Sequence, residues 1–251
     1  MKIKEYFEYV DKATVDDNGN VVFPKEVYEF NKELIEKYPW LKHNALYNEN
    51  EDKEYDYSKT WLDEIPRGWA IAFGEDIIRE INDELVKFNF VDEYKIVQIK
   101  EKFGELRWYD DGSPRGRLSE NYKVVEKKFG DDTPFYKWID SLGIDYDKQY
   151  IVLDHNENYE NPFDENHKFK ENHKEINKRN FENAIEVYHV YDIIEKCRIT
   201  DIIDKYEELS ARTCINCGKP AVYRSKGWIC PYCEDCIAPT GNYDRIEDVL
   251  L

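Results

Sequence analysis

The sequence predicts an α+β fold: a helix packed on a small antiparallel sheet, with an inserted subdomain and a C-terminal zinc ribbon. Three observations lead to this class. Residues 66–89 carry apolar side chains at helical spacing, residues 94–109 alternate with a period of two, and residues 214–236 contain two Cys-x-x-Cys pairs. The first two segments form the predicted central unit, and the third closes the chain around a metal ion.

The composition is that of a folded, acidic protein. The 251 residues carry a net charge of -18, and 15% of them are aromatic. Disordered acidic tails are poor in aromatic residues, so a folded chain is expected. The charge disfavours direct binding to nucleic acid or to an anionic membrane. No apolar run reaches the roughly 20 residues of a membrane span, and the first residues lack the apolar core of a signal peptide, so we expect a cytoplasmic protein.

Residues 1–112 are expected to form an N-terminal α+β unit with the central helix and hairpin. The dipeptide Asn18-Gly19 lies between two short β-prone runs, which predicts a first hairpin. A helix is expected over 24–37, with proline in its first turn. The central helix is predicted over 66–89, and the two strands of the central hairpin within 94–109.

Residues 113–182 differ in character and predict an inserted helical and polar segment. We expect helices over 118–129 and 133–142, a strand over 150–153, and then a polar tract. The histidines of that tract match no metal-binding or catalytic spacing, so a catalytic use is disfavoured. They are His155, His167 and His173.

The chain is then expected to return to the core over 183–211. A strand is predicted near 185–189, and helical spacing of apolar residues runs from 193 to 209. Residues 212–240 are assigned to the zinc ribbon. Residues 241–251 form a C-terminal tail that adds a last helical turn from residue 244.

Four cysteines carry the strongest motif of the chain. Cys214 and Cys217 form one Cys-x-x-Cys pair, Cys233 and Cys236 form another, and fifteen residues (218–232) separate them. This spacing is typical of structural zinc sites. Four thiolates fill a tetrahedral shell and leave no position for water, so we expect one structural Zn²⁺ and no hydrolytic chemistry there.

A fifth cysteine, Cys230, gives an alternative for the second metal-binding pair. Cys230 and Cys233 also have the spacing of a metal-binding pair, in which case Cys230 would replace Cys236. Pro231 favours an extended conformation of Cys230, as at the end of a strand through 227–229. We therefore assign the metal to Cys233 and Cys236.

The polar loop over 48–59 is a candidate partner-binding element. It alternates carboxylates with tyrosines, which can imitate the phosphates and stacked bases that a nucleic-acid-binding protein recognises. A charge run of this kind is also common in a simple solvated loop. The candidate residues are Glu49, Glu51, Asp52, Glu54, Tyr55, Asp56 and Tyr57.

A second set of residues favours a different class of function. Basic and aromatic side chains of the ribbon would contact phosphates and stack on bases, as in a nucleic-acid-binding or transcription accessory factor. The surrounding negative charge argues against high affinity. These residues are Lys219, Tyr223, Arg224, Lys226 and Trp228.

Two stretches carry further specific motifs. The first includes Ile65-Pro66-x-Gly68-Trp69, Ala72-Phe73-Gly74-Glu75 and Gln98-Ile99-Lys100-Glu101-Lys102-Phe103-Gly104-x-Leu106-Arg107-Trp108-Tyr109, and the second runs from Lys205 through the cysteine pairs. Over about 38–112 and 202–236 the chain thereby resembles a family of uncharacterised phage and prophage proteins. In that family the second metal pair falls on Cys233 and Cys236. The family lacks a segment like 113–182 and has no settled activity, so the resemblance implies an origin and a fold unit.

These observations lead to one main functional hypothesis. No phosphate-binding loop, dinucleotide fingerprint or nucleophile elbow occurs in the sequence, so no enzymatic activity is expected. We expect a non-enzymatic, acidic interaction protein of phage or prophage type that acts in the host cytoplasm. It would bind and inhibit a host protein, such as a basic nuclease or ribonucleoprotein of a CRISPR-type anti-phage defence complex, in a salt-sensitive association.

Overall fold

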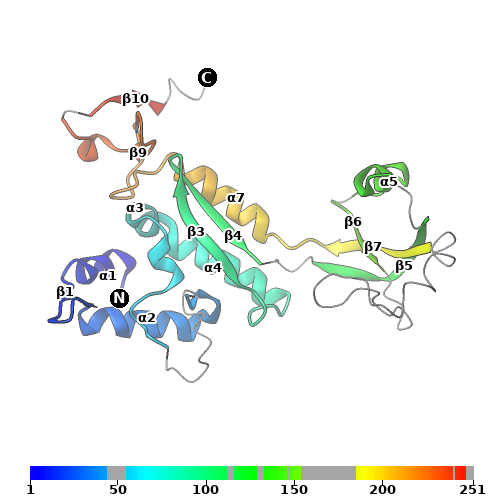
Figure 1. Cartoon of the computed structure of the whole chain (residues 1–251), viewed down its shortest axis with the longest axis horizontal. Helices are drawn as coiled ribbons and strands as arrows, with labels where there is room; N and C mark the ends of the chain where they lie inside the picture. Colours follow the sequence, from blue (N-terminus) through cyan, green and yellow to red (C-terminus); the bar gives the residue numbers. More distant parts are fainter. Residues whose placement is uncertain are drawn as a thin grey trace, which may run out of the picture. The chain divides into compact units, whose positions relative to one another are not determined.

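The computed structural model describes residues 1–43, 55–111, 116–128, 133–145, 147–153, 185–239 and 241–246. The chain divides into two compact units, one of Met1–Pro114 with Cys197–Leu251 and one of Arg115–Lys196 (Figure 1). Helices are combined with small antiparallel sheets, and four cysteines cluster near the C-terminus, which confirms the α+β class. Among the described helices, none combines the length and apolar character that crossing a bilayer requires.

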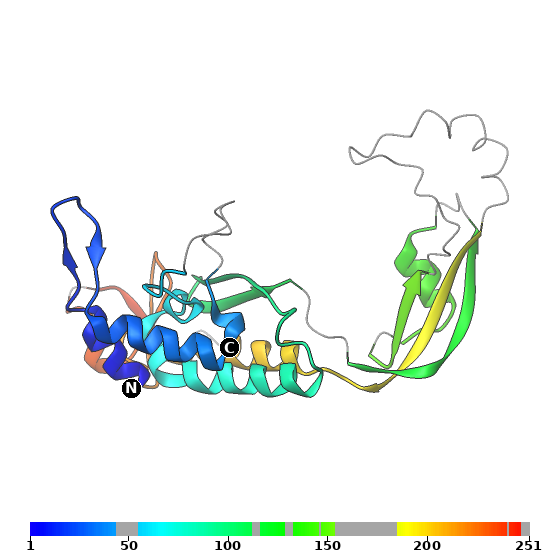
Figure 2. The ribbon, with the colours of Figure 1, turned by 90° about the horizontal axis from the view of Figure 1, so that it is seen from below.

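The first unit begins with two packed helices and a short hairpin (Figure 2). Helix α1 spans Ile3–Val10 and α2 spans Lys25–Lys37. Between them, β1 (Thr14–Val15) pairs with β2 (Val21–Val22), as Asn18-Gly19 predicts. The Asp16 carboxylate accepts the backbone N–H groups of Asn18 and Asn20, both at 2.8 Å, and so stabilises the turn.

The central helix is one run with an irregular turn near its start. Helix α3 (Arg67–Trp69) continues through the π-helical turn η4 (Ala70–Gly74) into α4 (Glu75–Lys87). Among the described residues before it are the 3-10 helices η1 (Pro39–Leu41) and η3 (Trp61–Glu64). The predicted helix over 66–89 is thereby confirmed. Its irregular turn lies beside the loop that carries Cys214 and Cys217.

The central hairpin lies against two helices. Strand β3 (Ile96–Lys102) pairs with β4 (Glu105–Asp110), and β4 packs on α7 (Ile199–Ser210). Two backbone N–H groups at the outer edge of β4 donate to side chains of α7: Leu106 N to Ser210 Oγ at 2.7 Å, and Trp108 N to Glu207 Oε1 at 2.8 Å. The helix therefore caps the edge of the hairpin and stabilises their packing.

One hydrophobic core joins these elements of the first unit. It is rich in aromatic side chains, which bury large apolar areas. Its most deeply buried large members, each less than 2% exposed, include Tyr6, Leu41, Leu62, Ile65, Trp69, Ile77, Ile78, Ile81, Leu85, Ile96, Leu106 and Ile199.

In its described residues, the second unit is a three-stranded antiparallel sheet with one helix. The strand order is β5 (Arg117–Lys128), β7 (Ile185–Glu195), β6 (Gln149–Leu153). Helix α5 (Phe135–Ser141) packs on one face, where Trp138 contacts the ring of Tyr188. The predicted helix over 133–142 and strand over 150–153 are both present.

Three predictions in this region are wrong. The segment 118–129 is the long strand β5, not a helix. Its register shifts between Leu118 and Tyr122, and such bulges interrupt the alternation by which a strand is recognised. The helical spacing read from 193 belongs first to β7, and α7 begins only at Ile199. The segment 183–211, expected to return to the core, therefore divides between the two units.

The C-terminal ribbon is a three-stranded antiparallel sheet in the order β10 (Tyr243–Arg245), β8 (Tyr223–Ser225), β9 (Pro231–Tyr232). The strand expected through 227–229 is instead the turn between β8 and β9, because Gly227 adopts φ +89°. Asp244 and Arg245, at the start of the expected last helical turn, belong to strand β10, but Ile246 is helical; residues 247–251 lie outside the described residues.

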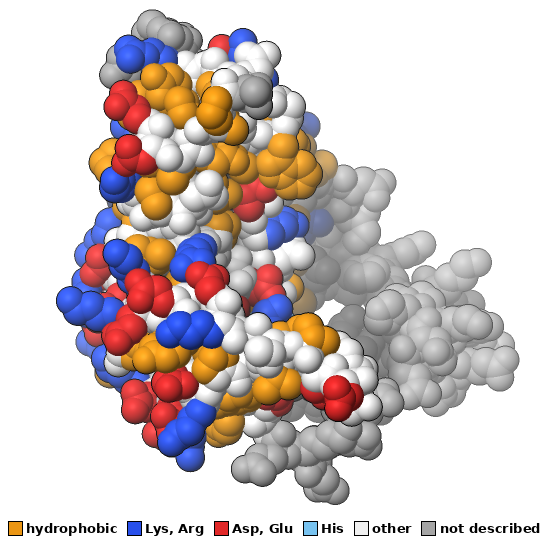
Figure 3. Space-filling view, turned by 90° about the vertical axis from the view of Figure 1, so that its left-hand side faces the viewer, with side chains coloured by type: hydrophobic (Ala, Val, Ile, Leu, Met, Phe, Trp, Pro, Cys, Tyr) orange, Lys and Arg blue, Asp and Glu red, His pale blue; other side chains and the backbone are white. Residues whose placement is uncertain are grey.

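On the face in Figure 3, charged side chains of both signs are interspersed over the lower half, and hydrophobic side chains gather in the upper part, where the ribbon lies. Two of the most exposed large hydrophobic residues of the described chain, Trp228 and Phe103, belong to the ribbon and to the tip of the central hairpin. This end of the first unit thus differs from the charged surface around it.

Candidate metal centre

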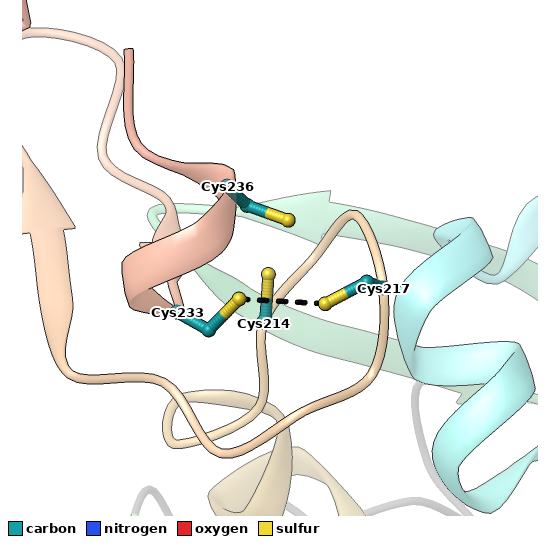
Figure 4. A group of neighbouring side chains, drawn as sticks. All are labelled: Cys214, Cys217, Cys233 and Cys236. Atoms are coloured by element: carbon teal, nitrogen blue, oxygen red, sulfur yellow. Dashed lines mark hydrogen bonds between the residues drawn. The ribbon is translucent and has the colours of Figure 1, made fainter. Parts of the chain in front are cut away.

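The sulfur atoms of Cys214, Cys217, Cys233 and Cys236 lie within 4.8 Å of one another. The four side chains point toward a common centre, and the sulfurs of Cys217 and Cys233 are 3.4 Å apart (Figure 4). The first pair lies in the loop between α7 and β8; of the second pair, Cys233 precedes the 3-10 helix η7 (Glu234–Cys236) and Cys236 is its last residue. Four cysteines so arranged could hold a metal ion.

Tight backbone turns direct each pair of sulfurs to this centre. In the first loop, the carbonyl oxygen of Cys214 accepts the N–H of Gly218 at 3.0 Å, and the N–H of Cys214 donates to Lys219 O at 2.8 Å. Gly218 adopts φ +79°, a conformation that glycine tolerates best. In the second loop, the N–H of Cys236 donates to the oxygen of Cys233 at 3.1 Å. The chain is therefore shaped for the cluster by its own backbone hydrogen bonds.

The first cysteine loop is also joined to the core of the first unit. The N–H of Gly68 donates to Ile215 O, and the fully buried indole of Trp69 donates to Thr213 O, both at 2.8 Å. A Cβ at Gly68 would lie 2.2 Å from the oxygen of Cys214, so α3 and the loop meet backbone to backbone. The cluster is thus part of the packing of the first unit.

The crowded thiols affect one another's ionisation. Burial acts to raise the pKa of Cys214, but backbone N–H groups, that of Cys233 first among them, outweigh it and lower this pKa to about 7. Burial and hydrogen bonds with neighbouring sulfurs raise the pKa of Cys236 instead. The four sulfurs therefore do not ionise together readily by themselves, and a bound cation would favour the thiolates. A set of four sulfur donors suits zinc or an iron centre.

Cys230 is not part of the cluster. The group of four contains Cys236 instead, so the pair Cys230/Cys233 is not the arrangement that the structure brings together. The Cys230 thiol is buried, and burial, followed by the nearby carboxylate of Glu101, raises its pKa.

Most of the candidate partner-binding loop lies outside the described residues. Glu49, Glu51, Asp52 and Glu54 lie outside the described residues, as do the three histidines of the polar tract. Hydrogen bonds hold the rest of the loop in place, among them one from the side-chain amide of Asn31 to Tyr57 O at 2.9 Å. The Tyr55 hydroxyl donates to Lys59 O at 2.6 Å and accepts the N–H of His43 at 3.0 Å, and the Asp56 carboxylate accepts the N–H of Ser58 at 2.9 Å. Tyr57 contacts the Tyr55 ring, with centroids 5.2 Å apart.

The cations of the alternative nucleic-acid patch are all paired with carboxylates. Lys219 lies 2.6 Å from Asp235, and Lys226 lies 2.7 Å from Asp244. Arg224 lies 3.8 Å from Glu105 of the central hairpin. The patch therefore carries less free positive charge than its sequence indicates. Sequence reasoning missed this because Glu105 and Asp244 come from other strands.

The aromatic members of the patch have different environments. Tyr223 is half-buried against the ring of Tyr243, with centroids 6.4 Å apart. Trp228 is 78% exposed at the turn between β8 and β9. Of the two, only Trp228 offers an open ring face to a partner.

A charged hollow of about 390 Å³ lies between α7, β4 and β8. Each arginine that lines it has a carboxylate neighbour: Arg107 binds Glu207 at 3.1 Å, and Arg212 lies 3.7 Å from Glu208. Arg224, paired with Glu105, completes the set. The hollow is therefore lined by internally compensated charges.

Comparisons of the chain with protein-family models, with curated proteins and with solved structures found no match in any of the three.

Proposed function

We propose that this chain is a non-enzymatic, acidic interaction protein of phage or prophage type, in which Cys214, Cys217, Cys233 and Cys236 hold one structural Zn²⁺. The spacing of the two pairs and the closed set of four sulfur donors support zinc. The hydrogen bonds from Gly68 and Trp69 to the first cysteine loop support a structural role. Zinc binding and folding of the ribbon would then be one process.

The proposed partner is a basic host protein, namely a nuclease or ribonucleoprotein of an anti-phage defence complex, which the chain would bind and inhibit in the host cytoplasm. The observation that carries this proposal is the pairing of charges on the ribbon. Lys219, Arg224 and Lys226 are each neutralised by a carboxylate, whereas the whole chain carries a net charge of -18. What the protein presents at long range is negative charge, which steers it toward a positively charged surface.

A capture experiment with purified defence complexes tests the proposal. The tagged full-length chain is mixed with a defence nuclease complex at about 50 and 500 mM NaCl, a range that separates weakly from strongly screened charges. Binding of the complex at low salt, its release at high salt and loss of its nuclease activity are the expected results. Recovery of nucleic acid alone would favour the alternative of a nucleic-acid-binding accessory factor.

Matched charge variants locate the binding surface. In one variant, Glu49, Glu51, Asp52, Glu54 and Asp56 of the candidate loop are replaced by the corresponding amides. The control variant changes five exposed glutamates of α1 and α2, which are Glu5, Glu8, Glu26, Glu33 and Glu36. If the loop forms the contact, only the first variant loses inhibition, although both change the net charge equally. Equal losses would contradict a role specific to the loop.

A further inference from the structure

Two exposed aromatic side chains lie at adjoining turns of the first unit. Phe103, at the tip of the β3–β4 hairpin, is 65% exposed, and Trp228, between β8 and β9, is 78% exposed. The two turns touch, because a Cβ at Gly104 would lie 3.1 Å from Ile229 O and 3.4 Å from Pro231 Cδ. The hairpin and the ribbon thus carry two exposed rings on turns that are in contact.

The backbone of Phe103 is held in an unfavourable conformation. Phe103 has φ +58° and Gly104 has φ +80°, as in a type I′ turn whose first position favours asparagine, aspartate or glycine. A bulky residue with positive φ is an outlier. Glu101 Oε1 accepts the N–H of Gly104 at 2.7 Å and holds the turn closed. Because the exposed ring gains little from packing, this strain points to a function outside the fold.

The turn that carries Trp228 is closed by hydrogen bonds. Ser225 Oγ accepts the N–H of Cys230 at 3.0 Å and donates to Trp228 O at 2.5 Å. The N–H of Ser225 also donates to Cys230 O at 3.0 Å, and Gly227 supplies the positive φ. The indole is therefore held in solvent by a turn that is already ordered, and binding would cost little conformational entropy.

Two lysines beside exposed rings have no carboxylate partner among the described residues. Lys100 Nζ lies 5.2 Å from the centroid of the Tyr109 ring, and Lys102 Nζ lies 5.4 Å from that of Phe103. Residues directly opposite each other share a face of the hairpin, so Lys100, Lys102 and Tyr109 lie on the same face as Arg107, Glu105 and Gln98. The Glu105 carboxylate opposite Lys102 is paired with Arg107 and Arg224. Lys100 donates to Gln98 Oε1, which leaves its charge uncompensated. These lysines differ in this respect from the paired cations of the ribbon.

We propose that Lys100, Lys102, Phe103, Tyr109 and Trp228, here called the tip site, bind single-stranded nucleic acid. The rings stack on bases, and the two ammonium groups neutralise phosphates; proteins that bind single strands combine these two kinds of contact. An exposed ring alone would suit the apolar cleft of a protein equally well, but uncompensated cations beside the rings complement phosphates. Stacking on exposed rings requires unpaired bases, so a duplex is disfavoured. The net charge of -18 keeps the affinity modest and salt-sensitive.

This inference goes beyond the proposed function and can fail independently of it, because its test contains no host protein. The zinc-loaded full-length chain is titrated against fluorescein-labelled dT15, rU15 and a 15-base-pair duplex, and binding is followed by fluorescence anisotropy. The expected result is binding of the single strands in 20 mM NaCl and little binding of the duplex. Two phosphate contacts predict an affinity about 25-fold lower in 200 mM NaCl, from a slope of about -0.7 per contact.

Variants separate stacking from charge. Trp228→Ala and Phe103→Asn should each weaken binding of dT15 about tenfold, as expected for one lost stacking contact. Phe103→Asn introduces a residue that the turn prefers, so this variant should melt at or above the temperature of the wild type. Lys102→Gln should reduce the salt slope by about 0.7. Tyr136→Ala, which removes a ring that is 59% exposed on α5 of the second unit, is the control and should leave binding unchanged.

Three outcomes would overturn the proposal. The first is no detectable binding of either single strand in 20 mM NaCl. The second is an unchanged affinity of Trp228→Ala and Phe103→Asn for dT15. The third is a chain that binds no oligonucleotide but sediments as a dimer that Trp228→Ala dissociates, because the rings would then form a protein contact.

Discussion

Replacing Gly68 by alanine should destabilise the first unit strongly, because α3 meets the cysteine loop at this residue. The new Cβ would lie 2.2 Å from Cys214 O and 2.5 Å from Ile215 O, and these backbone atoms cannot rotate away as a side chain can. Separating the two segments would break the hydrogen bonds from Gly68 N to Ile215 O and from Trp69 Nε1 to Thr213 O. The smallest expected costs are about 1 kcal/mol for overpacking and about 1 kcal/mol for each of the two buried donors left unpaired. Together they lower the free energy of unfolding by about 3 kcal/mol.

Urea unfolding followed by tryptophan fluorescence measures this loss, and Gly74→Ala is the matched control. At Gly74 the nearest atoms to a new Cβ are the side-chain methyls Ile3 Cδ1 and Leu62 Cδ1, both at 3.3 Å, which can shift. Alanine favours a helix over glycine by about 1 kcal/mol, which offsets the cost of moving these methyl groups. Gly74→Ala should therefore stay within about 1 kcal/mol of the wild type. The reasoning is refuted if Gly68→Ala unfolds as the control does.

Three other perturbations test the packing and the metal. Ser210→Ala should cost about 1–3 kcal/mol in urea unfolding, because Leu106 N loses its buried acceptor; a smaller loss than in the exposed control Ser141→Ala would contradict this. Burial acts to raise the pKa of Glu80, but hydrogen bonds from Lys205 and Tyr206 hold it below its ordinary 4.5. The free energy of unfolding of the wild type should therefore exceed that of Glu80→Gln by about 1 kcal/mol or less above pH 4.5. This difference should shrink below pH 4.5; a difference that does not change with pH would contradict a stabilising role of the Glu80 carboxylate. Zinc transfer to a chromophoric chelator should increase from about pH 7 to 5, because protons compete for the thiolates; a pH-independent transfer would argue against thiolate ligation.

Local signals account for the parts of the fold that the sequence predicts. Asn18-Gly19 requires a tight turn whatever surrounds it, and the apolar spacing over 66–89 defines a helix face without reference to other elements. The spacing of the cysteine pairs likewise reflects the tight turns that bring two sulfurs of one pair together. Each of these features is determined by neighbours within a few residues along the chain.

The sequence predictions fail where contacts with residues distant along the chain determine the structure. Strand β5 owes its conformation to pairing with β7, about 65 residues later in the chain, and its bulges conceal the alternation of a strand. The charge of the ribbon patch depends on Glu105 and Asp244, which reach Arg224 and Lys226 only in the folded sheets. The contact of Gly68 with the cysteine loop has no local signal beyond the glycine itself.

The zinc content of three proteins, the wild type, Cys236→Ser and Cys230→Ser, tests the proposed metal centre most directly. Each is purified in parallel, its zinc is measured by plasma mass spectrometry, and its melting is followed by circular dichroism. We expect one zinc per chain in the wild type and in Cys230→Ser. In Cys236→Ser we expect no bound zinc and a melting temperature lower by about 10 °C or more. Loss of zinc from Cys230→Ser with full zinc in Cys236→Ser would contradict the assignment of Cys236 as a ligand.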